Sequence, residues 1–193
     1  MKNAIVIFSF NRPDILLKSL NSIRVQNNIF NYDIFLYQDN NFNIFSKKSY
    51  CEEIIIEKNI SIFKKIFPEG KVILQKHNVG VGINHFNGYE DIFIKHGYEN
   101  GIFFDDDVIL GNNECVDTLI EMNKMTKDID NVMGSELYTI PFKYDACDKI
   151  LLLDTFKYHV DYKGFCCSLT KFKKIYEFYK SNVESFFAGI DYR

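Results

Sequence analysis

The sequence predicts an α/β fold in which a mainly parallel sheet carries helices on both faces. Apolar segments of strand length alternate along the chain with segments whose apolar residues recur at helical spacing. This alternation is typical of parallel sheets. The first strand-like segment, 4–10, is a nearly continuous apolar run, as expected of a strand covered on both faces. Both observations favour a single α/β domain spanning residues 1–193.

The composition fits one domain and argues against some classes of partner. The chain has 193 residues, of which 47% are hydrophobic and 16% aromatic, so it can bury a substantial core. Its net charge of −3 argues against a nucleic-acid-binding protein, which usually has a concentrated basic face. The five cysteines lack CxxC spacing and indicate reduced thiols in a cytoplasmic protein, with neither a zinc site nor a disulfide framework. No signal peptide or membrane-spanning helix is predicted.

Local patterns predict the individual elements. Pro13 suits the first turn of a helix, and Ser49 with Glu52 matches a capping box that would start another. Asn112 or Asn113 is a candidate cap for a later helix. The predicted strands are 4–10, 34–37, 71–75, 101–104, 132–134, 150–153 and 164–169. The predicted helices are 13–23, 49–67, the segment after the loop 78–82 that ends near 97, 114–127 and 170–182.

Three consecutive carboxylates, Asp105 to Asp107, follow the predicted strand 101–104 directly. Adjacent carboxylates repel one another and cannot all be buried without partners. At the end of a strand they suit a divalent cation, which prefers oxygen ligands. The alternative is an acidic surface turn, because a run of charges is usually solvated.

Polar residues also follow the other predicted parallel strands: Asn11 and Arg12 the first, Asp39 the second and Asn78 the third. Ligands of open α/β sheets bind beyond the carboxyl ends of the strands, so we expect these residues to share one site with the acidic triplet. Arg12 either offers a planar donor fork to a phosphate or base edge or is an ordinary surface charge. Asp39 either accepts hydrogen bonds from a nucleoside or forms an Asx turn with its neighbours.

The strand-end segments resemble those of GT-A glycosyltransferases, a family that uses nucleotide sugars and carries an aspartate-rich metal motif. Residues 5–13 are similar to the first strand and turn of the family-two-like enzymes. Gln38-Asp39 is similar to the acidic end of their second strand, and 78–80 to their Asn-x-Gly element. The triplet 105–107 stands where their DxD motif stands.

A narrower resemblance is to the N-acetylglucosaminyltransferase I type. It rests on Asn11-Arg12, on His85 before the acidic triplet, and on the late Gly164-Phe165 strand. The resemblance implies a GT-A, Rossmann-like domain in which residues of about 1–110 bind the nucleotide and those of about 111–193 face the acceptor. Its relatives usually continue beyond the point that corresponds to residue 193.

The resemblance also implies a role for each candidate site residue. Asp107 is expected to hold Mn²⁺ or Mg²⁺, which neutralises charge on the leaving diphosphate. Asp191 is expected to act as the general base on the acceptor hydroxyl in an inverting transfer. The acceptor is expected to be a glycan or glycolipid. The donor, expected to be a UDP-sugar, would contact Arg12, Asp39, His85, Asp105 and Asp106.

Two other functions stay open. A sugar-nucleotide-forming nucleotidyltransferase would need a glycine-rich, basic loop after the first strand, and residues 9–13 contain no glycine. A non-catalytic module that binds a nucleotide sugar or a protein partner is the second. Gly80 and Gly82 are attributed to backbone geometry, because two glycines do not make a nucleotide fingerprint. The remaining histidines, His77, His96 and His159, share no ligand spacing and are interpreted as structural.

The segment 171–180 interleaves basic and aromatic residues. Such a helix can rest on an anionic membrane surface near a lipid-linked acceptor. The alternative is an ordinary packed helix with one lysine face.

Overall fold

The computed structural model of the protein describes residues 2–126, 128–129, 135–136, 165–174, 176–177 and 180. Within this part of the chain, a six-stranded sheet has the order β5-β2-β1-β6-β8-β7. The strands predicted at 132–134 and 150–153 and the predicted base Asp191 lie outside the described residues.

The centre of the sheet is parallel, as the sequence predicts. β1 (Asn3–Ser9) pairs in parallel with β2 (Tyr32–Gln38) and with β6 (Asn100–Asp105), and β2 pairs in parallel with β5 (Lys71–Leu74). At the other edge, β8 (Phe165–Ser168) runs antiparallel to β6 and to the short strand β7 (Ser135–Glu136). The mainly parallel α/β fold is therefore confirmed.

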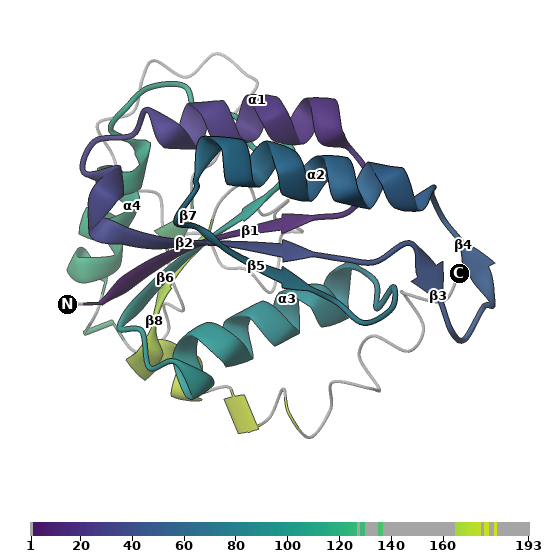
Figure 1. Ribbon diagram of the computed structural model, residues 1–193. Coiled ribbons are helices and arrows are strands. Elements are labelled where there is room, and N and C mark those ends of the chain that lie inside the picture. Colours follow the sequence, from purple (N-terminus) through teal and green to yellow (C-terminus); the bar gives the residue numbers. More distant parts are fainter. Residues whose placement is uncertain are drawn as a thin grey trace, which may run out of the picture.

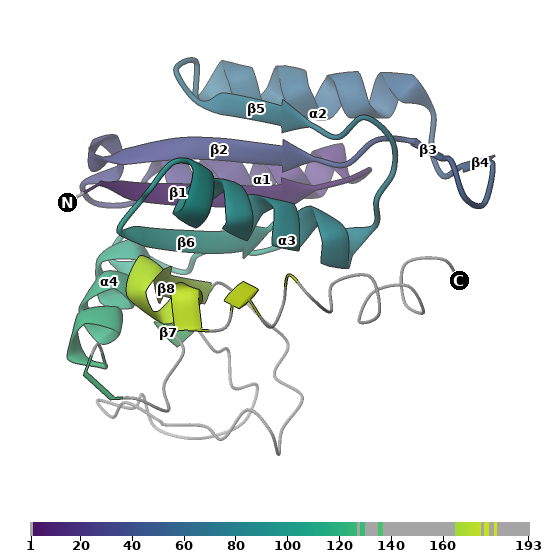
Figure 2. The ribbon, with the colours of Figure 1, turned by 90° about the horizontal axis from the view of Figure 1, so that it is seen from below.

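Helices cover both faces of the sheet (Figures 1 and 2). On one face, α1 (Pro13–Arg24), α2 (Glu53–Ile66) and α4 (Cys115–Met125) share a core with the sheet. The other face is covered by α3 (Val81–Glu90), which continues as the π-helix η2 (Asp91–Lys95). A short 3₁₀ turn, η1 (Ile29–Asn31), leads into β2.

The residues of β1 show why its sequence is apolar from Ala4 to Phe8. Ile5 and Ile7 belong to the core on the side of α1 and α2, whereas Val6 and Phe8 belong to the core on the side of α3. Successive side chains of a strand point to opposite faces. A strand that is covered on both sides therefore needs apolar residues at every position.

The predicted final helix is packed where the structure describes it. Phe172 and Tyr176 are buried against the α3 side of the sheet. Lys171 is also buried, and its Nζ donates a hydrogen bond to the carbonyl oxygen of Thr126 at the end of α4, at 2.6 Å. A cation is favourable at this end of a helix dipole. These three residues therefore match the packed-helix alternative.

The capping box predicted at Ser49 and Glu52 is wrong. Ser49 lies in a strand, α2 begins at Glu53, and the Glu52 side chain makes no capping hydrogen bond. Residues 42–49 instead form a hairpin of two short antiparallel strands, β3 (Phe42–Asn43) and β4 (Lys48–Ser49), which the sequence does not predict. The helix cap predicted at Asn112 or Asn113 agrees better with the structure. The Oδ1 of Asn112 accepts a hydrogen bond from the backbone N–H of Glu114 at 2.9 Å, just before α4 begins.

The order of the strands reverses at β1. The chain runs from β1 outward through β2 to β5, and then returns to place β6 on the opposite side of β1. The register pairs Phe8 of β1 with Asp105 of β6, so the segments that leave these two strands lie side by side. The crevice at such a reversal is where open α/β sheets bind their ligands.

Candidate active site

A cleft of about 530 Å³ opens at the carboxyl ends of β1, β2 and β6. This volume lies within the range of small-molecule sites. Nearly all the candidate donor-binding residues lie along its wall. The cleft is lined by Phe8, Ser9, Phe10, Asn11, Arg12, Asp39, Tyr50, Asn78, Gly80, Val81, Asn84, His85, Asp105 and Asp106.

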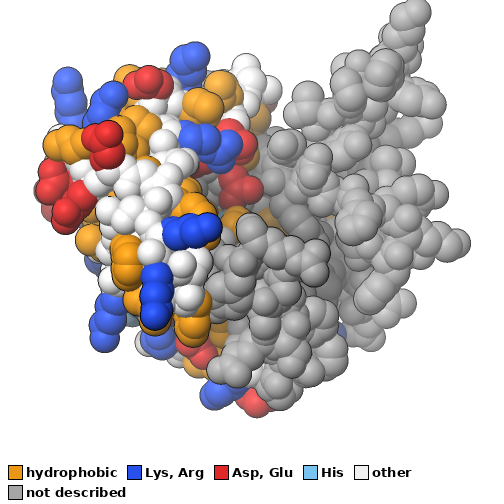
Figure 3. All heavy atoms as spheres, turned by 90° about the vertical axis from the view of Figure 1, so that its right-hand side faces the viewer, with side chains coloured by type: hydrophobic (Ala, Val, Ile, Leu, Met, Phe, Trp, Pro, Cys, Tyr) orange, Lys and Arg blue, Asp and Glu red, His pale blue; other side chains and the backbone are white. Residues whose placement is uncertain are grey.

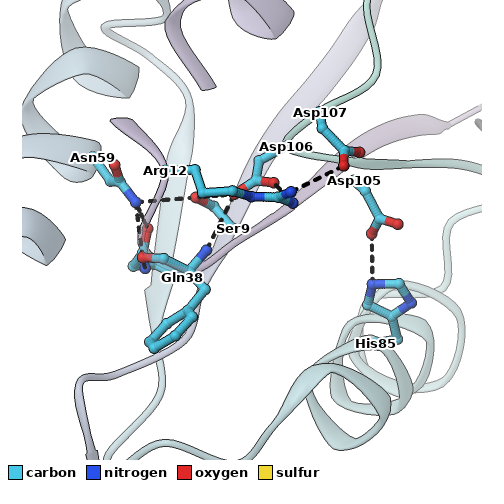
Figure 4. A network of polar contacts seen from close by, with 9 residues as sticks. Ser9, Arg12, Gln38, Asn59, His85, Asp105, Asp106 and Asp107 are labelled. Atoms are coloured by element: carbon cyan, nitrogen blue, oxygen red, sulfur yellow. Dashed lines mark hydrogen bonds and ion pairs between the residues drawn. The ribbon is translucent and has the colours of Figure 1, made fainter. Parts of the chain in front are cut away.

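The three carboxylates of the triplet point in different directions (Figure 4). Asp105 faces His85 on α3, with 2.8 Å between its Oδ1 and the Nε2 of the imidazole. Asp106 points inward, where only 2% of the residue is exposed. Asp107 points toward Arg12 from the outer side, and its side chain is 38% exposed. The repulsion expected of adjacent carboxylates is thus relieved by separate partners.

Asp106 is a buried carboxylate that is held by donors from the end of β1. Its Oδ2 accepts hydrogen bonds from the Ser9 hydroxyl at 3.2 Å and from the backbone N–H of Phe10 at 3.4 Å. Its Oδ1 forms an ion pair with the Arg12 guanidinium. Burial raises the pKa of Asp106 above its ordinary value, while Arg12 and the two donors oppose that rise. The carboxylate therefore depends on this set of partners.

Arg12 bridges two members of the triplet. One terminal nitrogen contacts Asp106, and the other lies 3.0 Å from Oδ2 of Asp107. Burial alone would lower the pKa of Arg12, but the charges of Asp106 and Asp107 raise it overall. A guanidinium suits this position because its planar fork can serve two oxygens at once. In this structure the positive charge beside Asp107 is thus supplied by the protein itself.

A buried polar network supports these groups from behind. Asn59 on α2 donates from its Nδ2 to Ser9 Oγ at 3.1 Å, to the Phe10 carbonyl oxygen at 2.9 Å and to Gln38 Oε1 at 3.1 Å. Gln38 at the end of β2 donates to the same Phe10 carbonyl at 2.7 Å. The role of Asn59 is not among those predicted from the sequence. Its signal was available, because Asn59 stands in the apolar stripe of α2 between Ile56 and Phe63.

His85 lies between an aromatic ring and a carboxylate. Its imidazole packs on Phe8 with 3.9 Å between ring centroids. The contact with Asp105 has the distance of an ion pair, although the ring N–H is not aligned to donate a hydrogen bond. The structure thus brings the predicted His85 to the acidic triplet, although the two segments are separated by η2 and β6.

Asp39 is buried, and its carboxylate oxygens accept several hydrogen bonds. Its oxygens accept hydrogen bonds from the backbone N–H groups of Asn40 and Val79, both at 2.9 Å, and of Gly80 at 3.0 Å. A fourth comes from the Asn78 side chain at 3.1 Å. An ionised carboxylate has about four lone-pair sites. Asp39 therefore ties the loop before α3 to the end of β2, and it combines a turn-forming role with its position in the cleft wall.

The predicted site residues that the structure describes thus converge. Arg12 contacts Asp106 and Asp107, and His85 contacts the adjacent Asp105. Arg12, Asp39, His85, Asp105 and Asp106 all line the same cleft. Asp191 is the exception, because it lies outside the described residues.

Comparison with known proteins adds evidence about the fold. No protein-family model and no curated protein matches the sequence. The fold is similar to that of TarS from S. aureus: residues 1–349 of TarS in complex with UDP-GlcNAc match with a TM-score of 0.56 and 16% identity, over 90% of this chain and 47% of that one. A cytidylyltransferase from Leptospira borgpetersenii matches with a TM-score of 0.50 and 11% identity, over 98% of this chain and 72% of that one.

At these identities the likeness concerns the fold, which this chain shares with GT-A-like glycosyltransferases and with nucleotidyltransferases. The chain spans about half the length of the TarS fragment that it matches. No helix in the described part of the chain is long and apolar enough to cross a membrane.

The donor atoms at the triplet fit a cation that arrives with a phosphate ligand. Among the described residues, no three His, Cys, Asp or Glu side chains form a ready metal site. Mg²⁺ commonly uses only one or two carboxylates and takes its other ligands from substrate phosphates and water. Asp107, which is partly exposed and shares one oxygen with Arg12, matches that kind of ligand.

Proposed function

We propose that this protein is a glycosyltransferase that moves a sugar from a nucleotide-sugar donor, a UDP-sugar, to a hydroxyl group of a glycan or glycolipid. The observation that carries the proposal is the convergence of Arg12, Asp39, Asp105 and Asp106 on one cleft at the reversal point of the sheet. Asp107 is paired with Arg12 beside this cleft. The similarity in fold to TarS, which was solved with UDP-GlcNAc, supports this choice of ligand.

Arg12 is the proposed contact of the diphosphate. Its side chain is 46% exposed and lies at the wall of the cleft, so a phosphate can reach it. Phosphate oxygens are strong partners for a planar guanidinium fork. A diphosphate that draws one terminal nitrogen away from Asp107 would free that carboxylate for a cation.

The nucleoside is proposed to lie against the loop that Asp39 organises. Asn78 and Gly80 line the cleft beside Asp39, and their positions depend on its carboxylate. A direct contact between Asp39 and the base or ribose would replace at least one of its four present donors. His85, Asp105 and Asp106 are proposed to face the ribose, sugar and phosphate part of the donor.

Asp107 is the proposed ligand of Mn²⁺ or Mg²⁺. The cation would supply positive charge to the leaving diphosphate. The acceptor oxygen would then bond to the anomeric carbon as the bond between that carbon and the diphosphate oxygen breaks. The hydroxyl proton would pass to a general base, and Asp191 remains our candidate for it. Attack from the side opposite the leaving group inverts the anomeric configuration.

A thermal-shift series tests the donor class. UDP and UDP-sugars with Mn²⁺ should raise the melting temperature more than either component alone, because a ligand that binds only the native state stabilises it. At a ligand concentration of about one hundred times Kd, the native state gains about 2.7 kcal/mol. Release of UDP from the donor then tests for turnover. No response to any uridine nucleotide would contradict the proposal.

Two competing functions are separated by the same series. A cytidylyltransferase-like enzyme, which shares the fold, would respond to a nucleoside triphosphate rather than to a UDP-sugar. A non-catalytic module would bind the donor without hydrolysing or transferring it. The Asp107→Ala variant completes the comparison: it should retain the fold, because the side chain is partly exposed, and lose metal-dependent turnover.

A further inference from the structure

The β3–β4 hairpin projects from the molecule beyond the carboxyl end of β2 (Figures 1 and 2). It spans Phe42 to Ser49 and is a two-stranded sheet of its own, separate from the central sheet. Tyr50, the next residue, lines the candidate active-site cleft. The hairpin is therefore at the rim of that cleft.

Hydrogen bonds from one buried residue hold the hairpin in shape. Asn43 is fully buried, and its Nδ2 donates to the carbonyl oxygen of Asn78 at 3.0 Å. Its Oδ1 accepts from the backbone N–H groups of Phe45 at 3.0 Å and Ser46 at 2.8 Å. The base of the hairpin is thus fixed to the loop before α3, and the conformation of its tip is defined.

This defined tip presents large apolar side chains to solvent. Phe42 is 43% exposed, Ile44 47% and Phe45 64%. Exposure of a single apolar residue is common, but a contiguous group on a projecting element usually marks an interaction site. Phe45 also contacts the ring of His77, with 6.4 Å between centroids, so the hairpin tip packs against the neighbouring loop.

Lysines surround the apolar tip. Lys47 and Lys48 on the hairpin and Lys76 on the neighbouring loop are all exposed. Lys47 adopts a left-handed backbone conformation with φ of 55°, which Gly or Asn adopts at lower cost. Figure 3 looks onto the side where the hairpin projects, and hydrophobic and cationic side chains lie next to one another on its described surface. The acids nearest in sequence, Glu52 and Glu53, lie at the start of α2 and outside the hairpin, and Figure 3 also shows acidic side chains on this side of the molecule.

We propose that the β3–β4 hairpin binds the surface of an anionic lipid membrane. Its apolar tip would enter the boundary between headgroups and acyl chains, and the flanking lysines would face anionic headgroups. The lysines favour this occupant over a purely apolar partner, because the charge on the hairpin is of one sign. This inference concerns a separate surface and goes beyond the proposed transfer reaction. If both hold, the rim of the cleft lies at the membrane, where a lipid-linked acceptor is found.

Flotation with lipid vesicles tests the proposal with the full chain. Vesicles of phosphatidylcholine alone are compared with vesicles of equal parts phosphatidylcholine and phosphatidylglycerol. The protein should float with the mixed vesicles and less with the neutral ones. The double variant Ile44→Ser/Phe45→Ser should bind at least about tenfold less, since its apolar contact is lost.

Two further variants separate membrane contact from folding and from general stickiness. Lys47→Asn places a residue that tolerates φ of 55° at this turn, so the fold is kept while one charge is lost, and binding to mixed vesicles should fall about fivefold. Phe30→Ser removes an aromatic that is 82% exposed on η1. This turn lies at the amino end of β2, whereas the hairpin follows its carboxyl end. It should bind as the wild type does.

Some results of these experiments would overturn membrane binding by the hairpin. Equal loss in the Phe30→Ser variant, or binding that does not depend on phosphatidylglycerol, would overturn the proposal. So would an absence of flotation together with a concentration-dependent dimer, measured by sedimentation, that dissociates in the Ile44→Ser/Phe45→Ser variant. That result would assign the tip to a second copy of the chain. Donor binding measured without vesicles reports on the proposed transferase separately.

Discussion

Arg12 connects the turn after β1 with the acidic triplet, across a separation of 94 residues to Asp106. Its strand-end position is visible in the sequence, but its partners are not. The guanidinium supports a carboxylate whose side chain is only 3% exposed, and such a charge is costly without a counter-ion. At the residue scale, Arg12 therefore contributes to stability as well as to the proposed binding of the diphosphate.

Replacement of Arg12 by Ala should destabilise the protein. Asp106 would lose its ion pair while remaining buried, and we expect a loss of about 1–3 kcal/mol after allowance for solvent around the exposed part of Arg12. Urea unfolding measures the change. Arg24→Ala, at the exposed end of α1, is the matched control and should change the free energy of unfolding by no more than about 0.5 kcal/mol.

A double-mutant cycle with Asp106→Asn attributes that loss to the pair. In the Asp106→Asn background the buried side chain is uncharged, so removal of Arg12 leaves no unpaired charge. Arg12→Ala should therefore reduce the free energy of unfolding less in this background, with a coupling of about 1 kcal/mol or more. Strict additivity of the two substitutions would contradict the role assigned to the ion pair.

Cys167 should make the native state sensitive to alkaline pH. Burial raises the pKa of its thiol from 9.0 to about 12, although Lys171 opposes the shift. The folded protein thus retains a proton that the unfolded chain loses above pH 9.0. Its contribution to stability is present below that pH and is lost progressively as the pH rises toward 12.

Unfolding free energies at several alkaline pH values check this expectation. The thiol alone should account for a loss of roughly 2 kcal/mol by a pH about 1.5 units above its unfolded pKa. Cys167→Ala removes that contribution and should flatten the pH dependence, although the variant is less stable at neutral pH because a buried atom is deleted. An unchanged slope in the variant would assign the alkaline loss to other groups.

At the scale of an element, α3 packs against the Phe8 ring of β1 through a glycine, Gly88. A Cβ atom added to Gly88 would lie 2.5 Å from one ring carbon of Phe8 and 2.7 Å from another. Phe8 in turn packs against His85. The small residue on α3 therefore determines how the helix approaches the sheet and where it places His85.

Gly88→Ala should destabilise the protein by about 1–2 kcal/mol. The clash with Phe8 costs about 1–3 kcal/mol. Better helix propensity returns only up to about 1 kcal/mol, so the net effect is a loss of stability. Thermal or urea unfolding measures the sum. Gly111→Ala is the control, because no heavy atom lies within 4 Å of the added Cβ. A stabilised Gly88→Ala variant would show that Phe8 moves aside freely.

The β3–β4 hairpin shows which elements escape prediction from sequence. Ser49 and Glu52 have the residue types of a helix start, yet Ser49 pairs with Phe42 across the hairpin. Asn43 stabilises the hairpin rather than a helix start, because its side chain hydrogen-bonds to Asn78, 35 residues away. Local propensity is a weak preference that such tertiary contacts override. Tertiary contacts override the sequence pattern less often in the central strands. Burial on both faces requires a run of apolar residues there, and that run is visible in the sequence.

At the scale of the whole molecule, the sheet order brings three distant segments to one cleft. Residues 10–12, 78–80 and 105–107 follow β1, β5 and β6, and each contributes to the wall or the contacts of the site. A ligand that occupies this cleft should protect them together. Residues 30–33, which line a separate pocket at the amino end of β2, should respond little.

Amide hydrogen exchange with and without UDP and Mn²⁺ measures that protection. We expect slower exchange in all three segments, including the Val79 and Gly80 amides that are bound to Asp39, and unchanged exchange at 30–33. Opening of these segments is rarer when a ligand stabilises the closed state. Protection confined to one segment, or present equally at 30–33, would place the nucleotide elsewhere.

The sequence alone was sufficient for the parallel α/β class, for most central strands and for the polar residues that follow them. Each of these depends on a repeating local pattern, and parallel topology brings strand ends to the same edge. The pairing of Arg12 with Asp106 and Asp107, the three donors from residues 78–80 to Asp39, and the support from Asn59 became visible only in three dimensions. These contacts join residues that are distant in sequence, and their partners are selected by strand order and helix packing, which no local pattern encodes.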